Sequence, residues 1–254
     1  MGHHGQMRAQ TGVGRGPDAD RSEQRYLPAS TFRSRRSALS DAQRQTWDRL
    51  WPRLGLSIGT PAPGEAGPGL VDTPAWFGRQ APVVLEIGCG TGTSTLAMAQ
   101  EEPGVDVIAV EVYRRGLAQL LSAIDRERVG NIRLIRGNAI VVLEQLVAPG
   151  SLTGVRVFFP DPWPKARHHK RRFLQPNTVG LIADRLLPGG VFHAATDHPG
   201  YAEHIAEVGD AEPRLRRATA QTRLPISVVR PTTKYESKAH QAGSAVTEFI
   251  WQRR

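Results

Sequence analysis

The residue types best suited to chemistry gather in a short proline-rich segment of this chain. Asp161 and Trp163 alternate there with Pro160, Pro162 and Pro164. Because each proline fixes its own φ and favours extended geometry in the residue before it, we expect both side chains on a stiff loop. A carboxylate and an indole can hold a nucleobase, although an indole beside prolines packs against its own loop about as often. A plain strand-ending turn is the simpler alternative.

A run of cations follows this loop directly. After Lys165 comes a stretch that we call the basic strip, residues 167–172, and its members are Arg167, His168, His169, Lys170, Arg171 and Arg172. We expect the strip to lie on a helix and to bind phosphates without reading base sequence. A solvated charged face is the usual alternative for such a run, and adjacency to the Asp161 loop is what favours the functional interpretation.

The charge of the whole chain indicates the same kind of partner. Its 254 residues contain 33 Lys and Arg against 24 Asp and Glu, a formal net charge of +9, and the sequence pI is about 10.5. Such a balance favours a polyanion, with nucleic acid as the leading candidate. A membrane surface is the other common target of basic proteins, but no apolar run approaches the roughly 18 to 20 residues needed to span a bilayer.

Cysteine content and the N-terminal sequence bear on location. Cys89 is the single cysteine, which excludes an intrachain disulfide, and residues 1–30 lack the apolar core of a signal peptide. We therefore expect a cytoplasmic protein with no membrane segment. His3 and His4 are too few for a metal site, so no metal is expected, and the choice between monomer and homodimer stays open.

A glycine-rich loop predicts a nucleoside cofactor. Gly88, Gly90 and Gly92 follow an apolar strand-like run and precede a helical pattern, a context in which glycines let a ligand approach the backbone. The third glycine comes one residue earlier than in the dinucleotide fingerprint. Glu86, just before the loop, would repel a pyrophosphate. It suits a cofactor that carries a sulfonium and an ammonium, such as S-adenosylmethionine.

Polar residues also follow three further strand candidates. Glu111 ends the second, where an acid can accept hydrogen bonds from ribose hydroxyls of either S-adenosylmethionine or NAD. Asn138 follows the third, and its amide could read an adenine edge, cap the next helix, or do both. Asp197 ends a later strand. It could supply a second carboxylate for a base or act as the N-cap of the helix after Pro199.

The elements that must position these residues alternate along the chain. Apolar segments of strand length are separated by longer helical patterns, which predicts an α/β protein with a mostly parallel sheet and helices on both faces. The last strand is expected to be antiparallel. The crossover helices are predicted at Thr93 to Gln100, Tyr113 to Arg128 and Ala139 to Val147. The seven strand candidates are Val83 to Ile87, Val107 to Glu111, Ile132 to Arg136, Val155 to Phe159, Val191 to Thr196, Ile226 to Arg230 and Val246 to Trp251.

Composition divides the chain into three zones. Residues 1–30 have almost no apolar content and are expected to be a disordered basic tail. Residues 31–81 are expected to form an extension with a short helix capped by Ser40, followed by a linker rich in proline and glycine that holds no element. Residues 82–254 should form the compact domain. The apolar residues of the short helix are Trp47, Leu50 and Trp51.

Taken together, four segments resemble the bacterial tRNA (guanine-N7)-methyltransferases. They occur in the family's order over about residues 30 to 254. The glycine loop is shared by many methyltransferases, whereas the Pro-Asp-Pro-Trp and Thr-Lys-Tyr-Glu segments are much narrower signals. The four are Glu86 with the glycine loop, Phe158 to Lys165 with the basic strip, Ala195 to Asp197, and Arg230 to Glu236.

The resemblance implies a Rossmann-like class I fold and methyl transfer from S-adenosylmethionine to guanine N7, at position 46 in the tRNA variable loop. It implies RNA contacts for the basic strip. The matching cofactor positions are Glu86, Glu111, Asn138 and Asp161, and the matching substrate positions are Lys165, Asp197, Thr233, Lys234, Tyr235 and Glu236. Two departures are visible. Asn138 stands where many members have Asp, although its amide oxygen still accepts a hydrogen bond, and the tract from Thr60 to Gln80 is longer than usual.

The chemistry asks little of the protein beyond positioning. Guanine N7 has an in-plane lone pair and no proton, so no general base is needed. A fixed carboxylate near the purine would stabilise the positive charge that arrives there, and Asp161 is our choice for this catalytic role. It could instead hold the guanine N1 and N2 hydrogens or the cofactor's ammonium.

Three other functions compete with this interpretation. An NAD-dependent oxidoreductase would use the glycine loop and Glu111, and a non-catalytic RNA-binding protein would keep only the basic surface. A DNA adenine methyltransferase would carry a similar Asp-Pro-Pro-aromatic loop, but residues 163–165, Trp-Pro-Lys, break that pattern.

Overall fold

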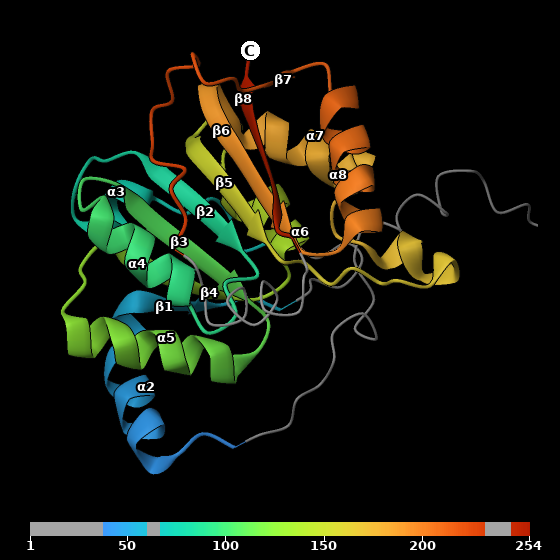
Figure 1. Ribbon diagram of the computed structural model, residues 1–254. Helices are drawn as coiled ribbons and strands as arrows, with labels where there is room; N and C mark the ends of the chain where they lie inside the picture. Colours follow the sequence, from blue (N-terminus) through green and yellow to red (C-terminus); the bar gives the residue numbers. More distant parts are fainter. Residues whose placement is uncertain (1–37, 60–66, 232–244) are drawn as a thin grey trace, which may run out of the picture.

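The computed structural model describes residues 38–59, 67–231 and 245–254. These residues form one eight-stranded sheet with the order β1-β4-β3-β2-β5-β6-β8-β7 (Figure 1). Neighbouring strands from β1 to β6 pair in parallel, whereas β8 pairs antiparallel with both β6 and β7. The strands are β1 (Gly55–Ser57), β2 (Val83–Ile87), β3 (Asp106–Glu111), β4 (Ile132–Arg136), β5 (Leu152–Phe158), β6 (Leu186–Thr196), β7 (Leu215–Arg217) and β8 (Thr247–Arg253).

This sheet confirms the predicted α/β architecture, with its antiparallel last strand, and corrects the strand count of seven. Gly55–Ser57 and Leu215–Arg217 are short edge strands that apolar patterning missed. Ile226 to Arg230, predicted as a strand, is not one. Ile226 instead packs on the face of the sheet with Val84, Val105 and Val191. Its apolar character reflects burial without pairing.

Helices cover both faces of the sheet (Figure 1). One apolar cluster joins a face to α2, α4 and α5, and another joins the opposite face to η2, α7 and α8. Removal of these side chains from water on both faces stabilises the strands between them. The helices are α2 (Asp41–Leu54), α3 (Thr73–Phe77), α4 (Thr93–Glu101), α5 (Arg114–Glu127), α6 (Ala139–Val141), η2 (Val142–Leu146, a π-helix), η3 (Ala166–Arg171, a 3₁₀-helix), α7 (Pro176–Arg185) and α8 (Pro199–Ala211).

The N-terminal helix has the predicted cap. The Gln43 backbone N–H donates to Ser40 Oγ over 3.2 Å, and the Ser40 N–H donates to the Gln43 side chain over 3.1 Å. This reciprocal pair satisfies donors that a helix start leaves open. Trp47 and Leu50 are buried against α5, and the helix leads into β1, so residues from the predicted extension join the sheet. The domain boundary near residue 82 stays a prediction.

The expectation that residues 60–82 are a linker without an element is wrong at α3. Asp72 caps this short helix by accepting a hydrogen bond from the Ala75 N–H over 3.0 Å, and Gly78 ends it with a φ of 75°. Proline and glycine mark its ends and do not prevent it. No helix in the described ranges is long and apolar enough to cross a membrane.

A pocket at the carboxyl ends of the parallel strands

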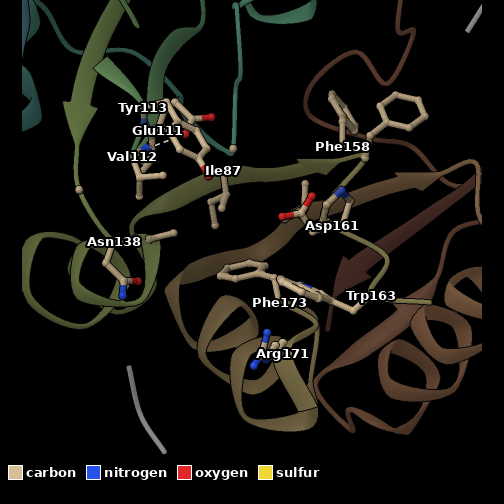
Figure 2. Close-up of a pocket in the computed structure, with 17 residues that line it drawn as sticks. Ile87, Glu111, Val112, Tyr113, Asn138, Phe158, Asp161, Trp163, Arg171 and Phe173 are labelled. Atoms are coloured by element: carbon tan, nitrogen blue, oxygen red, sulfur yellow. Dashed lines mark hydrogen bonds between the residues drawn. The ribbon is translucent and has the colours of Figure 1, made fainter. Parts of the chain in front are cut away.

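A pocket lies where β2, β3, β4 and β5 end, the edge at which open α/β sheets bind ligands (Figure 2). Four of the residues predicted to bind the cofactor line it: Gly88, Glu111, Asn138 and Asp161. Glu111 and Asn138 lie on one side, and Asp161 lies on the other (Figure 2). Strand ends and the proline-rich loop therefore share one cavity.

The glycine loop adopts a left-handed backbone at all three glycines. Gly88, Gly90 and Gly92 have φ values of 73°, 57° and 77°. This region is strained for residues that carry a Cβ. Gly88 lines the pocket, whereas Gly90 and Gly92 shape the turn behind it, and Gly92 directly precedes α4.

Glu111 is held rigidly at the end of β3. Its Oε1 accepts from the N–H groups of Val112 (2.7 Å) and Tyr113 (3.0 Å), and its Oε2 accepts from that of Gly90 (3.0 Å). Burial raises the pKa of this carboxyl, and the three backbone hydrogen bonds oppose that shift. A carboxylate has about four acceptor sites, so Glu111 can still accept from a ribose hydroxyl.

Glu86 does not line the pocket. It is 3% exposed, and its Oε1 accepts a hydrogen bond from the Thr95 hydroxyl over 2.9 Å. Among the described residues its Oε2 has no partner. Burial raises the pKa of this carboxyl, opposed first by the charge of Arg156, its register neighbour on β5, and then by Thr95. This carboxylate oxygen without a partner could accept a hydrogen bond from a cationic group.

Asn138 caps α6 and lines the pocket at the same time. Its Oδ1 accepts from the Ile140 N–H over 2.9 Å. The capping role considered from sequence is therefore confirmed, and it orients the amide. Contact with an adenine edge stays a prediction.

The Asp161 loop is strained. Phe159 and Trp163, on either side of it, have φ values of 50° and 43°, which non-glycine residues rarely adopt. The Phe159 N–H donates to the Ala195 carbonyl of β6 over 2.8 Å, which fixes the start of the loop. Asp161 itself is exposed at the rim of the pocket.

Trp163 packs and also lines the cavity. Its ring meets His168 edge-on with centroids 5.7 Å apart, and the Arg171 guanidinium carbon lies 5.1 Å from the ring centroid. Trp163 and Arg171 both line the pocket. The packing interpretation is confirmed, and base stacking stays a prediction.

The basic strip lies on the 3₁₀-helix η3 up to Arg171, with Arg172 just beyond its end, and holds two kinds of cation. Arg167 and Lys170 are exposed, as phosphate contacts require. Arg172 is 2% exposed and donates to the Pro162 and Gly200 carbonyls. The prediction that Arg172 contacts RNA is contradicted by this burial, because a phosphate cannot reach the side chain.

The remaining substrate residues lie outside the pocket lining. Lys165 and Asp197 are exposed and do not line the cavity. The idea that Asp197 caps α8 is wrong: the cap is His198, whose Nδ1 accepts from the Tyr201 N–H over 3.2 Å. Residues 233–236, the predicted Thr-Lys-Tyr-Glu segment, lie outside the described residues.

Sequence reasoning missed an ion cluster beside the Asp161 loop. The Arg230 guanidinium carbon lies 5.0 Å from the Phe159 ring centroid, and its Nη2 is 2.8 Å from a Glu248 oxygen. The other Glu248 oxygen is 2.9 Å from buried His193. Hydrogen bonds from His193 and then Arg230 lower the pKa of Glu248 to about 2. No local signal marks these contacts, since their partners come from separate segments.

Comparison with known proteins identifies the chain. A family described as putative methyltransferase matches residues 80–249. A tRNA (guanine-N(7)-)-methyltransferase of Mycolicibacterium paratuberculosis is 77% identical, with 100% of both chains aligned. The chain belongs to the tRNA (guanine-N(7)-)-methyltransferase family. Members from Mycobacterium leprae and Mycobacterium tuberculosis are 69% and 67% identical, covering 91% and 100% of this chain and 99% and 96% of their own.

Family membership confirms the resemblance and the Rossmann-like class I methyltransferase fold inferred from sequence. Among solved structures, the 16S rRNA methyltransferase KamB aligns with 75% of this chain and 97% of its own, at 16% identity and a TM-score of 0.49. That likeness is too weak to bear on the site, so the assignment of roles rests on the geometry of the pocket.

Proposed function

We propose that this protein transfers a methyl group from S-adenosylmethionine to N7 of a guanine in tRNA, at position 46 of the variable loop. The observation that carries the proposal is a single pocket lined by Glu111 on one side and by Asp161 and Trp163 on the other. A nucleoside cofactor on the strand ends would face a base held by the loop. The relatives named above bear this activity in their names.

The residues present fit such a cofactor. Glu86 lies behind the pocket lining, and its buried oxygen without a described partner would be satisfied by a positively charged amine that reaches it. Glu111 offers remaining acceptor sites to the ribose, and Asn138 stands at the pocket wall for the adenine. When bound, S-adenosylmethionine supplies an electrophilic methyl group.

Asp161 is the proposed catalytic residue. Guanine N7 needs no deprotonation, so the protein must orient the base and stabilise the positive charge that develops on the purine. A carboxylate on a stiff loop at the rim can do both. Asp197, at the end of β6, would contact the same base from the neighbouring turn.

The exposed cations of the basic strip would hold the tRNA backbone. Arg167 and Lys170 project from η3, directly after the Asp161 loop. Phosphate contacts at this place would hold the nucleotide near the rim without selecting its base. We place this activity in the cytoplasm, where tRNA is modified.

The deciding experiment maps methylation on unmodified tRNA. Wild-type protein and labelled S-adenosylmethionine should place one label at N7 of guanine 46, and a transcript with adenine at that position should stay unlabelled. Labelling at another atom or position would overturn the proposal. So would tight binding of NAD with no binding of S-adenosylhomocysteine.

A further inference from the structure

One cation of the basic strip points inward. Arg172 is 2% exposed, although it directly follows residues whose side chains reach solvent. Its Nε donates to the Pro162 carbonyl over 2.9 Å, and its Nη1 donates to the Gly200 carbonyl over 3.1 Å. Its guanidinium carbon lies 4.7 Å from the Tyr201 ring centroid. Two carbonyls and a ring face therefore surround a buried charge.

One carbonyl lies on the Asp161 loop, and the other lies at the start of α8, directly after the turn that carries Asp197. Pro162 follows Asp161, and Gly200 lies three residues after Asp197. These turns leave the adjacent parallel strands β5 and β6, which are paired up to Phe158 and Ala195. Beyond that register pair and the Phe159 N–H bond to Ala195, no backbone hydrogen bond joins the two segments among the described residues. Arg172 bridges them again.

The platform under this guanidinium is itself fixed. Tyr201 is fully buried on α8, and its hydroxyl accepts from the Leu174 N–H over 3.1 Å. Burial raises the pKa of Tyr201 well above its usual range, so the ring stays neutral at any working pH. A buried, neutral, hydrogen-bonded ring gives a cation one preferred place. The ring that supports the Arg172 guanidinium is therefore held in place by its own hydrogen bond.

The loop needs such an anchor. Positive φ values at Phe159 and Trp163 are strained for residues that carry a Cβ and persist only where contacts impose them. A planar guanidinium with several fixed donors can hold two carbonyls at once, whereas an ammonium cannot reproduce that geometry.

We infer that Arg172 is a positioning residue that sets the distance between the Asp161 loop and the Asp197 turn. This inference rests on the proposed function, because its consequence is the placement of the guanine between the two carboxylates. Arg172 acts through Pro162 and Gly200 and touches neither cofactor nor base. It differs in role from Arg167 and Lys170, whose exposed side chains are available to phosphates.

The test compares Arg172→Lys with a matched control. Arg133→Lys changes another buried arginine that donates to backbone carbonyls, including that of Trp76 over 3.1 Å, and stacks 4.5 Å from the Phe77 ring centroid. Arg133 lies near the start of β4, whereas the pocket lies at the strand ends. Both variants lose a similar set of contacts.

Under saturating tRNA and cofactor, Arg172→Lys should lower kcat by about 10- to 100-fold, since misplacement by about 1 Å can cost that much. Its affinity for S-adenosylhomocysteine and its KM for tRNA should change less than about threefold. The slope of log tRNA affinity against log salt should stay unchanged, because no phosphate contact is lost. Arg133→Lys should keep wild-type kcat.

Arg172→Met provides a second variant should the lysine prevent folding, because it keeps much of the buried volume and removes both donors. It should show the same loss of kcat. Wild-type kcat in either variant would overturn the inference, as would a salt slope reduced by about one with kcat unchanged, which is the signature of a phosphate contact. A parallel loss of cofactor affinity would also overturn it. Failure of wild-type protein to methylate guanine N7 would instead refute the proposed function.

Discussion

The two sides of the pocket are built differently. We call the wall with Glu111 and Asn138 the cofactor side and the wall with Asp161 the substrate side, after their proposed roles. On the cofactor side, the carboxylate of Glu111 ends a strand and accepts three backbone hydrogen bonds, and Asn138 caps a helix. On the substrate side, Asp161 stands on an exposed loop with strained residues on either side. The β-sheet itself positions the first set. The second set depends on side chains that tie the loop to its neighbours.

This difference indicates which contacts each half requires. A strand end is fixed by pairing on both sides, so Glu111 is in place before any ligand arrives. The Asp161 loop has one backbone bond to β6, and side chains such as Arg172 and Arg230 supply the remaining anchors. Substitutions on the two sides should therefore fail in different ways.

The largest expected effect comes from the substrate side. Asp161→Asn should lower methyl transfer by about 10²–10³-fold, the usual cost of removing one group that stabilises transition-state charge. Single-turnover transfer of labelled methyl to tRNA measures this. Binding of S-adenosylhomocysteine, followed by calorimetry, should weaken less than about tenfold. A loss of binding as large as the loss of rate would place Asp161 chiefly on the cofactor side and break the comparison.

The second effect belongs to the cofactor side. Glu111→Gln should weaken S-adenosylhomocysteine binding by about 10- to 100-fold, because hydrogen bonds to a charged group are worth roughly 1.5–3 kcal/mol. The same change lowers stability, since Gly90, Val112 and Tyr113 donate to this carboxylate. Thermal unfolding should show that loss in the empty protein.

Glu111→Gln bound to saturating cofactor should transfer methyl at a rate near wild type. If its rate at saturation fell as far as that of Asp161→Asn, the two sides of the pocket would not be separable.

Acidification should affect the cofactor side next. Burial raises the pKa of Glu86 and Glu111 above the ordinary 4.5. If binding requires the ionised forms, affinity for S-adenosylhomocysteine falls as the pH drops through those raised values, by up to about tenfold per pH unit for each group. Calorimetry in buffers of different ionisation enthalpy should then detect protons released on binding.

Stability should move in the opposite direction. An acid whose folded pKa is raised holds its proton longer in the folded state, so its contribution to stability improves as the pH falls toward 4.5.

In the calorimetric binding experiment, Glu86→Gln should reduce the number of protons released when S-adenosylhomocysteine binds. Equal release by wild type and Glu86→Gln would show that Glu86 does not respond to the cofactor.

The positions of the strand-end residues follow from the sequence more closely than those of the loop residues, for a physical reason. The glycine loop and Glu111 are set by strand ends, whose positions follow from apolar patterning. Arg172 cannot be distinguished from Arg171 by local sequence, because its inward direction depends on Pro162 and on Gly200, 28 residues later. Apolar patterning predicts a strand at Ile226 because it indicates that a segment is buried, and it does not show whether the segment pairs with another strand.

The smallest expected effect concerns the exposed cations. Lys170→Ala should reduce the slope of log tRNA affinity against log salt by about 0.7 to 0.9, the value for one phosphate contact, and weaken binding only a few-fold. Arg126→Ala is the control, because it removes an exposed cation from the other end of the chain's α5 helix. That helix starts beside Tyr113, which lines the pocket, and Arg126 lies near its far end, so the slope should stay unchanged. Since Arg172 is buried, only the exposed members of the strip should alter this slope. Equal effects of Lys170→Ala and Arg126→Ala would mean that tRNA senses net charge alone, and the strip would then have no special place on the substrate side.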